Sequence, residues 1–142
     1  MAYHQRFRRS AFINMLKTLS VALTQNQRSA VSAACQALDW PVEFCESPTQ
    51  AFDQLQAGSY DCLITKLVMD DMDGMELINT TRTLFPDIKI IAVNNFVGGR
   101  VDYGKVACQV GADLAITEAD FNEQINERIR SLVVEHAGAT QC

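Results

Sequence analysis

Five short apolar runs alternate along this chain with stretches whose apolar residues recur at helical spacing. The runs that read as strands are residues 19–23, 42–45, 62–64, 87–93 and 114–116. The helices are expected after Asn26, from Ser47, from Met75 to about Leu84, from about Asp102 to Val110, and through Ile125, Ile129 and Leu132. Strands that are largely apolar on both faces are typical of a parallel sheet covered by helices. The order therefore predicts a doubly wound α/β domain with five parallel strands between two helical layers.

Capping residues support these boundaries. Ser47 can cap the second helix, Pro48 is tolerated at its first position, and Gln50 can reach back to the cap. Gly111 suits the C-terminal cap of the fourth helix, because glycine adopts the required backbone conformation easily.

Length and charge narrow the class of protein. The 142 residues suit one domain, and no segment approaches the run of about 18 apolar residues that crosses a bilayer. The net charge of −5 argues against a general nucleic-acid binder, since such proteins hold phosphates with clustered cations. We expect a soluble, cytoplasmic protein that neither inserts into a membrane nor binds nucleic acid.

The chain divides into three parts. Residues 1–17 form a basic extension with four cations and no acid, which leaves 8 basic and 17 acidic residues in the rest of the chain. Residues 18–134 form the domain, and residues 135–142 form a small, polar, flexible tail. The extension is either solvated or contacts an acidic partner, and its apolar residues could also build a homodimer.

Metal and catalytic patterns are missing from the sequence. The five cysteines are odd in number and have no C-x-x-C spacing, which fits neither a zinc site nor a disulfide framework. A calcium loop through Asp70, Asp71 and Asp73 would need acids where Met69 and Thr80 stand. No Ser-His-Asp or Cys-His arrangement can be proposed, so we expect no enzyme activity and no metal or cofactor.

Three motifs lie in order on the predicted elements. They are Met72-Asp73-Gly74-Met75-Glu76-Leu77, Pro86-Asp87-Ile88 before the fourth strand, and Gly111-Ala112-Asp113 before the fifth. Together they resemble the response-regulator receiver domain of bacteria, and the resemblance covers about residues 18–134. It implies a flavodoxin-like (βα)5 sandwich. It also implies phosphoryl transfer to an Asp at the tip of the third strand, with magnesium held nearby.

The residues that the family uses for this chemistry are replaced here. Counting from the matching motifs puts the acceptor at Lys66, the acid pair around Thr24 and Gln25, the hydroxyl at Asn94 and the family lysine at Glu118. An ammonium group cannot form an acyl phosphate and repels magnesium. The resemblance therefore implies the fold without the chemistry, and we expect no bound magnesium.

In the family, an acid at the position of Lys66 faces a lysine at the position of Glu118. Here the two charges are exchanged, which suggests an ion pair between Lys66 and Glu118 across the position of the family's phosphorylation pocket. The alternative is that each side chain is solvated independently.

The family's switching aromatic on the fifth strand is replaced by Ala115, so we expect a locked conformation. By analogy with the family, the interaction surface lies between Val101 and Val134, with Tyr103, Lys105 and Gln109 as contributors. Arg100 follows a glycine loop that is either flexible or a small anion-binding nest.

The sequence thus predicts a pseudo-receiver that acts as a phosphorylation-independent protein interaction module in bacterial signalling or organisation. Its partner would be a signalling or scaffold protein. Two alternatives stay open: a small-ligand or anion sensor that uses the altered pocket, and an unusual phosphoacceptor receiver, with Asp70 or Asp71 in place of Lys66.

Overall fold

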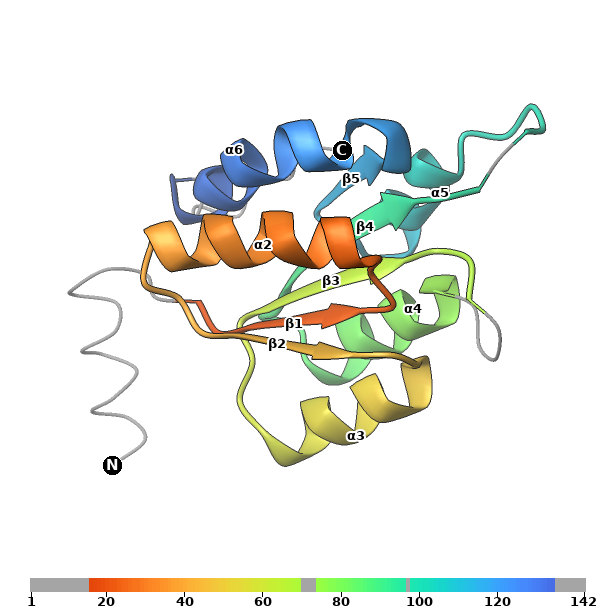
Figure 1. Ribbon diagram of the computed structural model, residues 1–142. Helices are drawn as coiled ribbons and strands as arrows, with labels where there is room; N and C mark the ends of the chain where they lie inside the picture. Colours follow the sequence, from red (N-terminus) through yellow and green to blue (C-terminus); the bar gives the residue numbers. More distant parts are fainter. Residues whose placement is uncertain (1–15, 70–73, 97, 135–142) are drawn as a thin grey trace.

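A computed structural model describes residues 16–69, 74–96 and 98–134 (Figure 1). In chain order the elements are β1 (Thr18–Val21), α2 (Gln25–Ala37), β2 (Val42–Cys45), α3 (Pro48–Ala57), β3 (Cys62–Lys66), α4 (Gly74–Leu84), β4 (Lys89–Asn94), α5 (Tyr103–Val110), β5 (Leu114–Thr117), the 3-10 turn η1 (Glu118–Asp120) and α6 (Phe121–Val134). None of the described helices is both long and apolar enough to span a bilayer.

The five strands form one parallel sheet in the order β2-β1-β3-β4-β5. Helices α2 and α6 pack on one face, and α3, α4 and α5 pack on the other (Figure 1). The predicted doubly wound, flavodoxin-like α/β fold is confirmed. Every parallel strand therefore ends at the same edge of the sheet, where ligands bind in folds of this kind.

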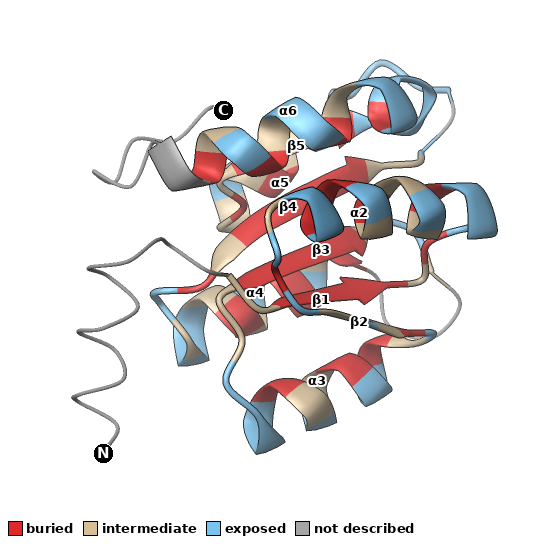
Figure 2. Ribbon diagram, turned by 60° about the vertical axis from the view of Figure 1, so that its left-hand side comes forward, coloured by how far each residue is buried: buried red, intermediate tan, exposed pale blue. Residues whose placement is uncertain are grey.

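The central strands are buried on both faces, which explains why they read as continuous apolar runs (Figure 2). Along β3, Leu63 packs toward α3, α4 and α5, whereas Ile64 packs toward α2 and α6. Ile90 and Ile91 of β4 alternate in the same way. This period of two divides the core into two apolar clusters on either side of the sheet.

The first strand is shorter than predicted. It ends at Val21 instead of residue 23, because Ala22 has a φ of 62° and turns the chain out of the strand. Leu23 remains buried, which explains its apolar character without a strand. Helix α2 then starts at Gln25 with Thr24 as its N-cap, two residues earlier than the sequence reading.

Two other strand boundaries also shift by two residues. Strand β3 continues beyond Ile64 to Lys66, and the fourth strand begins at Lys89 instead of residue 87. The predicted caps are confirmed: Ser47 Oγ accepts a hydrogen bond from Gln50 N, and Gly111 ends α5 with a φ of 145°.

One arginine joins three elements at the edge of the sheet opposite the candidate site. Arg82 Nη2 lies 2.7 Å from Asp113 Oδ2, and its Nε donates to the Gly111 carbonyl. Its Nη1 donates to the carbonyls of Pro86 and Ile88. These bonds tie α4 to the segments that lead into β4 and β5.

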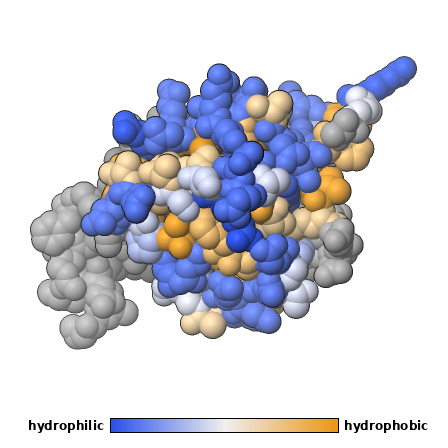
Figure 3. All heavy atoms as spheres, in the orientation of Figure 1, coloured by the Kyte–Doolittle hydropathy of each residue, from blue (hydrophilic) through white to orange (hydrophobic). Residues whose placement is uncertain are grey.

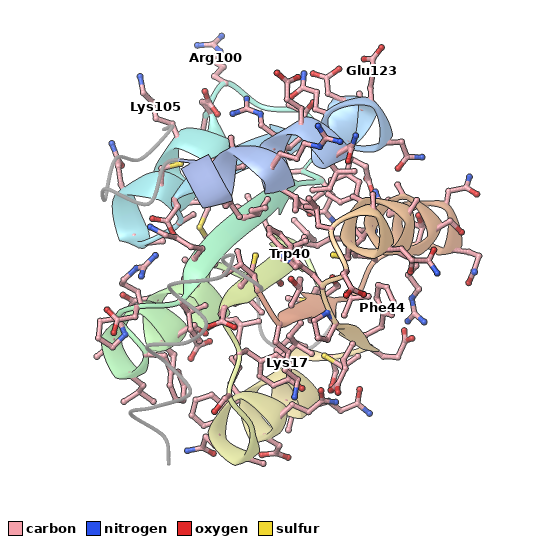
Figure 4. All side chains as sticks on the ribbon, turned by 90° about the vertical axis from the view of Figure 1, so that its left-hand side faces the viewer. Lys17, Trp40, Phe44, Arg100, Lys105 and Glu123 are labelled. Atoms are coloured by element: carbon pink, nitrogen blue, oxygen red, sulfur yellow. The ribbon has the colours of Figure 1, made fainter. Side chains whose placement is uncertain are left out.

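Leu16 and Lys17, assigned from the sequence to the basic extension, belong to the folded body. Lys17 N donates to Asp61 Oδ2, and Lys17 Nζ lies 4.6 Å from the centre of the Tyr60 ring (Figure 4). Leu16 packs against the α2 and α6 face of the core. The rest of the predicted extension and the tail at 135–142 fall outside the described residues.

Candidate functional site

The candidate site lies at the carboxyl edge of the sheet. Lys66 ends β3, Asn94 ends β4, and Glu118 follows β5 directly. Because β3 and β4 are neighbours and β5 adjoins β4, the three residues meet at one edge although the sequence separates them widely.

Lys66 and Glu118 form an ion pair, as expected from the sequence. Lys66 Nζ lies 3.1 Å from Glu118 Oε2. The Lys66 side chain is 12% exposed and that of Glu118 is 40% exposed, so the pair is partly shielded from water. An ion pair at this depth is screened less by salt than one on the open surface.

Gln27 joins Glu118 to helix α2. Its Nε2 donates to Glu118 Oε2 at 2.9 Å, and its Oε1 accepts from Thr24 N. Thr24 Oγ1 in turn accepts from Gln27 N, which completes a capping box at the start of α2. Burial alone would raise the pKa of Glu118. The hydrogen bonds from Gln27 and Lys66, with the Lys66 charge, outweigh that effect and lower the pKa below 4.5.

The other residues assigned to the first strand tip lie elsewhere. Thr24 and Gln25 are exposed at the start of α2, and Thr24 acts as the cap. The residue beside Lys66 is Ala22, because Val21 pairs with Thr65 and both Ala22 and Lys66 line one hollow. The structure therefore places Thr24 and Gln25 beyond the tip of the first strand. The positions nearer the strand, Val21 and Ala22, carry no carboxylate either.

Gln27 is the main site residue that the sequence reading missed. The signal was present in the Thr24-x-x-Gln27 spacing, which is the pattern of a capping box. A capping glutamine whose Nε2 remains available can also donate to a neighbouring element, as Gln27 does to Glu118.

Asn94 and its neighbour Asn95 have different roles. Asn94 Oδ1 accepts from Phe96 N within the β4–α5 loop. Asn95 Oδ1 accepts from the amides of Leu67 and Val68 at 3.1 and 2.9 Å, and its Nδ2 donates to the Val68 carbonyl. The amide of Asn95 therefore holds the segment that follows Lys66 against the end of β4.

Gly74 approaches the same segment closely. Its amide donates to the Leu67 carbonyl at 2.7 Å. A Cβ on Gly74 would lie only 1.9 Å from the Lys66 carbonyl oxygen, so only glycine fits here. The acidic residues Asp70, Asp71 and Asp73 fall outside the described residues.

A hollow of about 260 Å³ opens beside Lys66, lined in part by Ala22, Glu46, Ser47, Lys66, Val68 and Asn95. Its charged groups already have partners: Lys66 pairs with Glu118, and Glu46 pairs with Arg28. Ser47 Oγ caps α3. Among the described residues, no group of three or more His, Cys, Asp or Glu side chains could hold a metal ion.

A second hollow, of about 220 Å³, lies between α5 and the edge strand β5. Asn94, Asp102, Gly104, Lys105, Ala115 and Thr117 contribute to it, and we call it the α5–β5 hollow. A Cβ on Gly104 would lie 3.2 Å from the Ala115 Cβ, so small residues line its floor. Lys105 stands at its margin and is exposed.

Of the proposed surface residues, Lys105 lines this hollow. Arg100, Lys105 and Gln109 are exposed, whereas Tyr103 is half-buried. The Tyr103 ring packs on Phe96 with 4.5 Å between ring centres. Phe96 is 43% exposed, and the sequence reading missed it because it considered the glycine loop for flexibility and anion binding only.

The described free cysteines are structural. Cys35 of α2, Cys45 of β2 and Cys62 of β3 are buried. Burial raises the pKa of Cys45 to about 11 and also raises the pKa of Cys35 and Cys62. Such thiols are poor nucleophiles at neutral pH.

Solved structures of other proteins share this fold. Chemotaxis response regulator CheY4 of Vibrio cholerae is 21% identical with a TM-score of 0.69, covering 83% of this chain and 98% of that one. A two-component response regulator from Clostridium difficile is 12% identical with a TM-score of 0.74, covering 86% and 98%. These two likenesses concern the fold.

Sequence comparison identifies the family. Response regulator receiver protein CpdR of Brucella abortus (strain 2308) is 28% identical over 82 residues, which is 57% of this chain and 68% of the relative. The family model of the response regulator receiver domain matches residues 14–130. This chain therefore belongs to the response regulator receiver domain family.

Proposed function

We propose that this receiver domain is a pseudo-receiver, which binds a protein partner without being phosphorylated. The observation that carries the proposal is the ion pair between Lys66 and Glu118, 3.1 Å apart, at the edge of the sheet where the acceptor would stand. Signalling modules of this family act through other proteins. We infer that the partner is a signalling or scaffold protein in the bacterial cytoplasm.

The chemistry of the site supports the absence of phosphoryl transfer. An acyl phosphate forms on a carboxylate, and the Lys66 ammonium offers none. Glu118 puts a negative charge where an incoming phosphoryl group needs a cation. Magnesium prefers several oxygen ligands and would meet the Lys66 charge, so we propose that the domain binds no magnesium and has no catalytic role.

The contacts around Lys66 favour one conformation over a two-state switch. Asn95 holds the backbone of Leu67 and Val68, and Gly74 bonds to Leu67. Gln27 ties Glu118 to α2. A ligand shifts a conformational equilibrium only when it binds the two states with different affinities. Here the contacts within the domain stabilise a single state when no ligand is bound.

The two alternatives have less support. An anion sensor would need an uncompensated cation in the Lys66 hollow, but Lys66 pairs with Glu118 and Arg28 pairs with Glu46. An unusual phosphoacceptor would use Asp70 or Asp71, which lie outside the described residues, and no described cluster of acids could hold its magnesium.

Incubation with acetyl phosphate and magnesium tests the proposal. We expect intact-mass spectrometry to show no acid-stable, hydroxylamine-labile phosphoryl adduct on the wild-type chain. A receiver with an acceptor Asp, treated in parallel, establishes that the reagent is active. A magnesium-dependent adduct on the wild type, at any residue, would overturn the proposal.

A further inference from the structure

A hollow at the amino edge of the sheet lies outside the candidate site. It measures about 270 Å³ and is formed by the segments that lead into β3 and β4 and by the end of α3. We call it the amino-edge hollow, and it is lined in part by Leu55, Tyr60, Asp61, Phe85, Asp87 and Ile88. Among the described residues that line it, the charged ones are Asp61 and Asp87, and both are acids.

Two cations near the amino-edge hollow have acidic partners. Lys17 Nζ lies 4.6 Å from the centre of the Tyr60 ring and 3.9 Å from Glu43 Oε2. Arg82 Nη2 lies 2.7 Å from Asp113 Oδ2. The charges of these two cations are therefore balanced before the two acids of the hollow are counted.

Lys89, the cation at the start of β4, lies on the other side of the sheet. Ile88 and Ile90 belong to the α3, α4 and α5 side of the core, so the alternation of β4 directs Lys89 toward α2 and α6. Helix α3, at the bottom of Figure 3, contains no basic residue and has a mainly hydrophilic outer surface. The amino-edge hollow is therefore negatively charged, and charge complementarity favours a cationic occupant.

The chemistry of the amino-edge hollow suits an arginine side chain. An arginine can bury its methylene stem on apolar surface while its planar guanidinium binds carboxylates. Here the buried side chains of Leu55 and Ile88 offer the apolar surface, and Asp61 and Asp87 offer the carboxylates. An apolar cavity of about 150 Å³ can hold a benzene molecule, so a hollow of about 270 Å³ has room for a guanidinium and its stem.

The basic extension joins the domain at this edge of the sheet. Lys17 N donates to Asp61 Oδ2 at 3.0 Å, so the chain enters beside a carboxylate that lines the hollow. Residues 1–15, which fall outside the described residues, contain Arg6, Arg8 and Arg9 and no acid. The chain between Arg9 and Lys17 is long enough to span roughly 26 Å when extended, so an arginine can reach back to the hollow.

We propose that residues 1–15 fold back on the amino edge of their own chain, where one arginine of the segment inserts its guanidinium between Asp61 and Asp87. The short connection keeps this arginine at a high effective concentration, which favours binding within one chain over binding to an external partner. The extension is thus an internal ligand, and its arginines serve neither an acidic partner protein nor a homodimer. The inference does not involve Lys66, so it stands apart from the proposed function.

Limited proteolysis with trypsin, which cleaves after arginine, tests the docking on the full chain. Mass spectrometry measures the rate of cleavage within residues 6–9. Asp87 is exposed, so Asp87→Asn should leave the fold intact and speed this cleavage roughly threefold, because it removes one acid from the docked arginine. Glu123→Gln makes the same charge change at an exposed position of α6, well away from Lys17 (Figure 4), and should leave the rate unchanged.

Amide chemical shifts in NMR locate the docking site independently. Replacing the three arginines of the extension with glutamine in the full chain should shift the amides of Asp61 and Asp87. The control variant Arg100→Gln/Lys105→Gln/Arg130→Gln also removes three cations, all exposed and none in an ion pair with a described residue, and should leave these two amides unshifted. Circular dichroism establishes that each variant is folded.

The proposal is overturned if Asp87→Asn and Glu123→Gln change the cleavage rate equally, or if replacing the arginines leaves the amides of Asp61 and Asp87 unshifted. A dilution series separates docking within one chain from exchange between two copies. We expect the wild-type shifts to be independent of concentration and the chain to sediment as a monomer. Shifts that weaken on dilution together with a dimer would show that the extension of a second copy occupies the hollow, and would also overturn the proposal.

Discussion

The ion pair between Lys66 and Glu118 makes a quantitative prediction about stability. Glu118→Gln removes the negative charge but keeps an oxygen that can accept from Gln27. Lys66, only 12% exposed, is then left without its partner. Lys66→Met removes the cation and leaves Glu118, which is 40% exposed, in contact with water and Gln27.

The exposed fractions of the two side chains determine how much the free energy of unfolding should fall in each variant. Fully exposed pairs contribute about 0.2–1 kcal/mol, and breaking a buried pair costs about 3–5 kcal/mol. With one partner mostly buried and the other not, we expect the free energy of unfolding to fall by about 2 kcal/mol for Glu118→Gln and by about 1 kcal/mol for Lys66→Met. The double variant should lose about 2 kcal/mol, which gives a coupling energy of about 1 kcal/mol.

Urea unfolding followed by circular dichroism measures the four free energies of this double-mutant cycle. Lys17 and Glu43 provide a matched control, because their charged atoms are 3.9 Å apart and their side chains are 36% and 52% exposed. We expect the coupling of that control pair to be smaller and to vanish in high salt. Additive effects at Lys66 and Glu118, to within about 0.3 kcal/mol, would refute the reasoning.

Four further outcomes follow from the same structure. Because the pKa of Glu118 is lowered in the folded state, its stabilising contribution is present above pH 4.5 and is lost as the pH falls below that value. The urea concentration at the unfolding midpoint should therefore change less with pH in this range for Glu118→Gln than for the wild type. Arg82→Met removes the side-chain donor to three backbone carbonyls and the cation paired with Asp113, and should lower the free energy of unfolding by about 3 kcal/mol in urea titrations, whereas a loss under about 1 kcal/mol would contradict these roles. Gly74→Ala forces a Cβ against the Lys66 carbonyl and should cost about 3 kcal/mol or prevent folding, which thermal unfolding detects; a wild-type midpoint would refute the close approach. Asn95→Ala removes the acceptor of Val68 N, whereas Leu67 N keeps the Val93 carbonyl, so the Val68 amide should exchange hydrogen faster by NMR, while the amides of α6 should not change.

The fold could be predicted from the sequence because its signals are local and agree with one another. The runs in β3 and β4 are apolar on both faces, the caps at Ser47 and Gly111 mark helix ends, and the alternation allows few topologies. The strand ends were predicted less well. The positive φ of Ala22, which shortens β1, has no signal in the sequence, since alanine rarely adopts it.

The candidate site was predictable only in part, because some of its contacts depend on turns that leave no signal in the sequence. Lys66 ends one strand and Glu118 follows another, and the fold determines where both strands end, so their proximity follows from topology. The bonds from Gln27 and Asn95 depend on side-chain directions after a turn, which element order does not specify. The packing of Phe96 on Tyr103 depends in the same way on the path of the β4–α5 loop.

Titration with beryllofluoride and magnesium, followed by amide chemical shifts in NMR, tests the central claim most directly. Beryllofluoride mimics a phosphoryl group on a carboxylate acceptor. With Lys66 paired to Glu118, we expect the amides of Lys66, Ala115 and Glu118 to stay unshifted at every concentration. A saturable, magnesium-dependent shift of these amides would contradict the account.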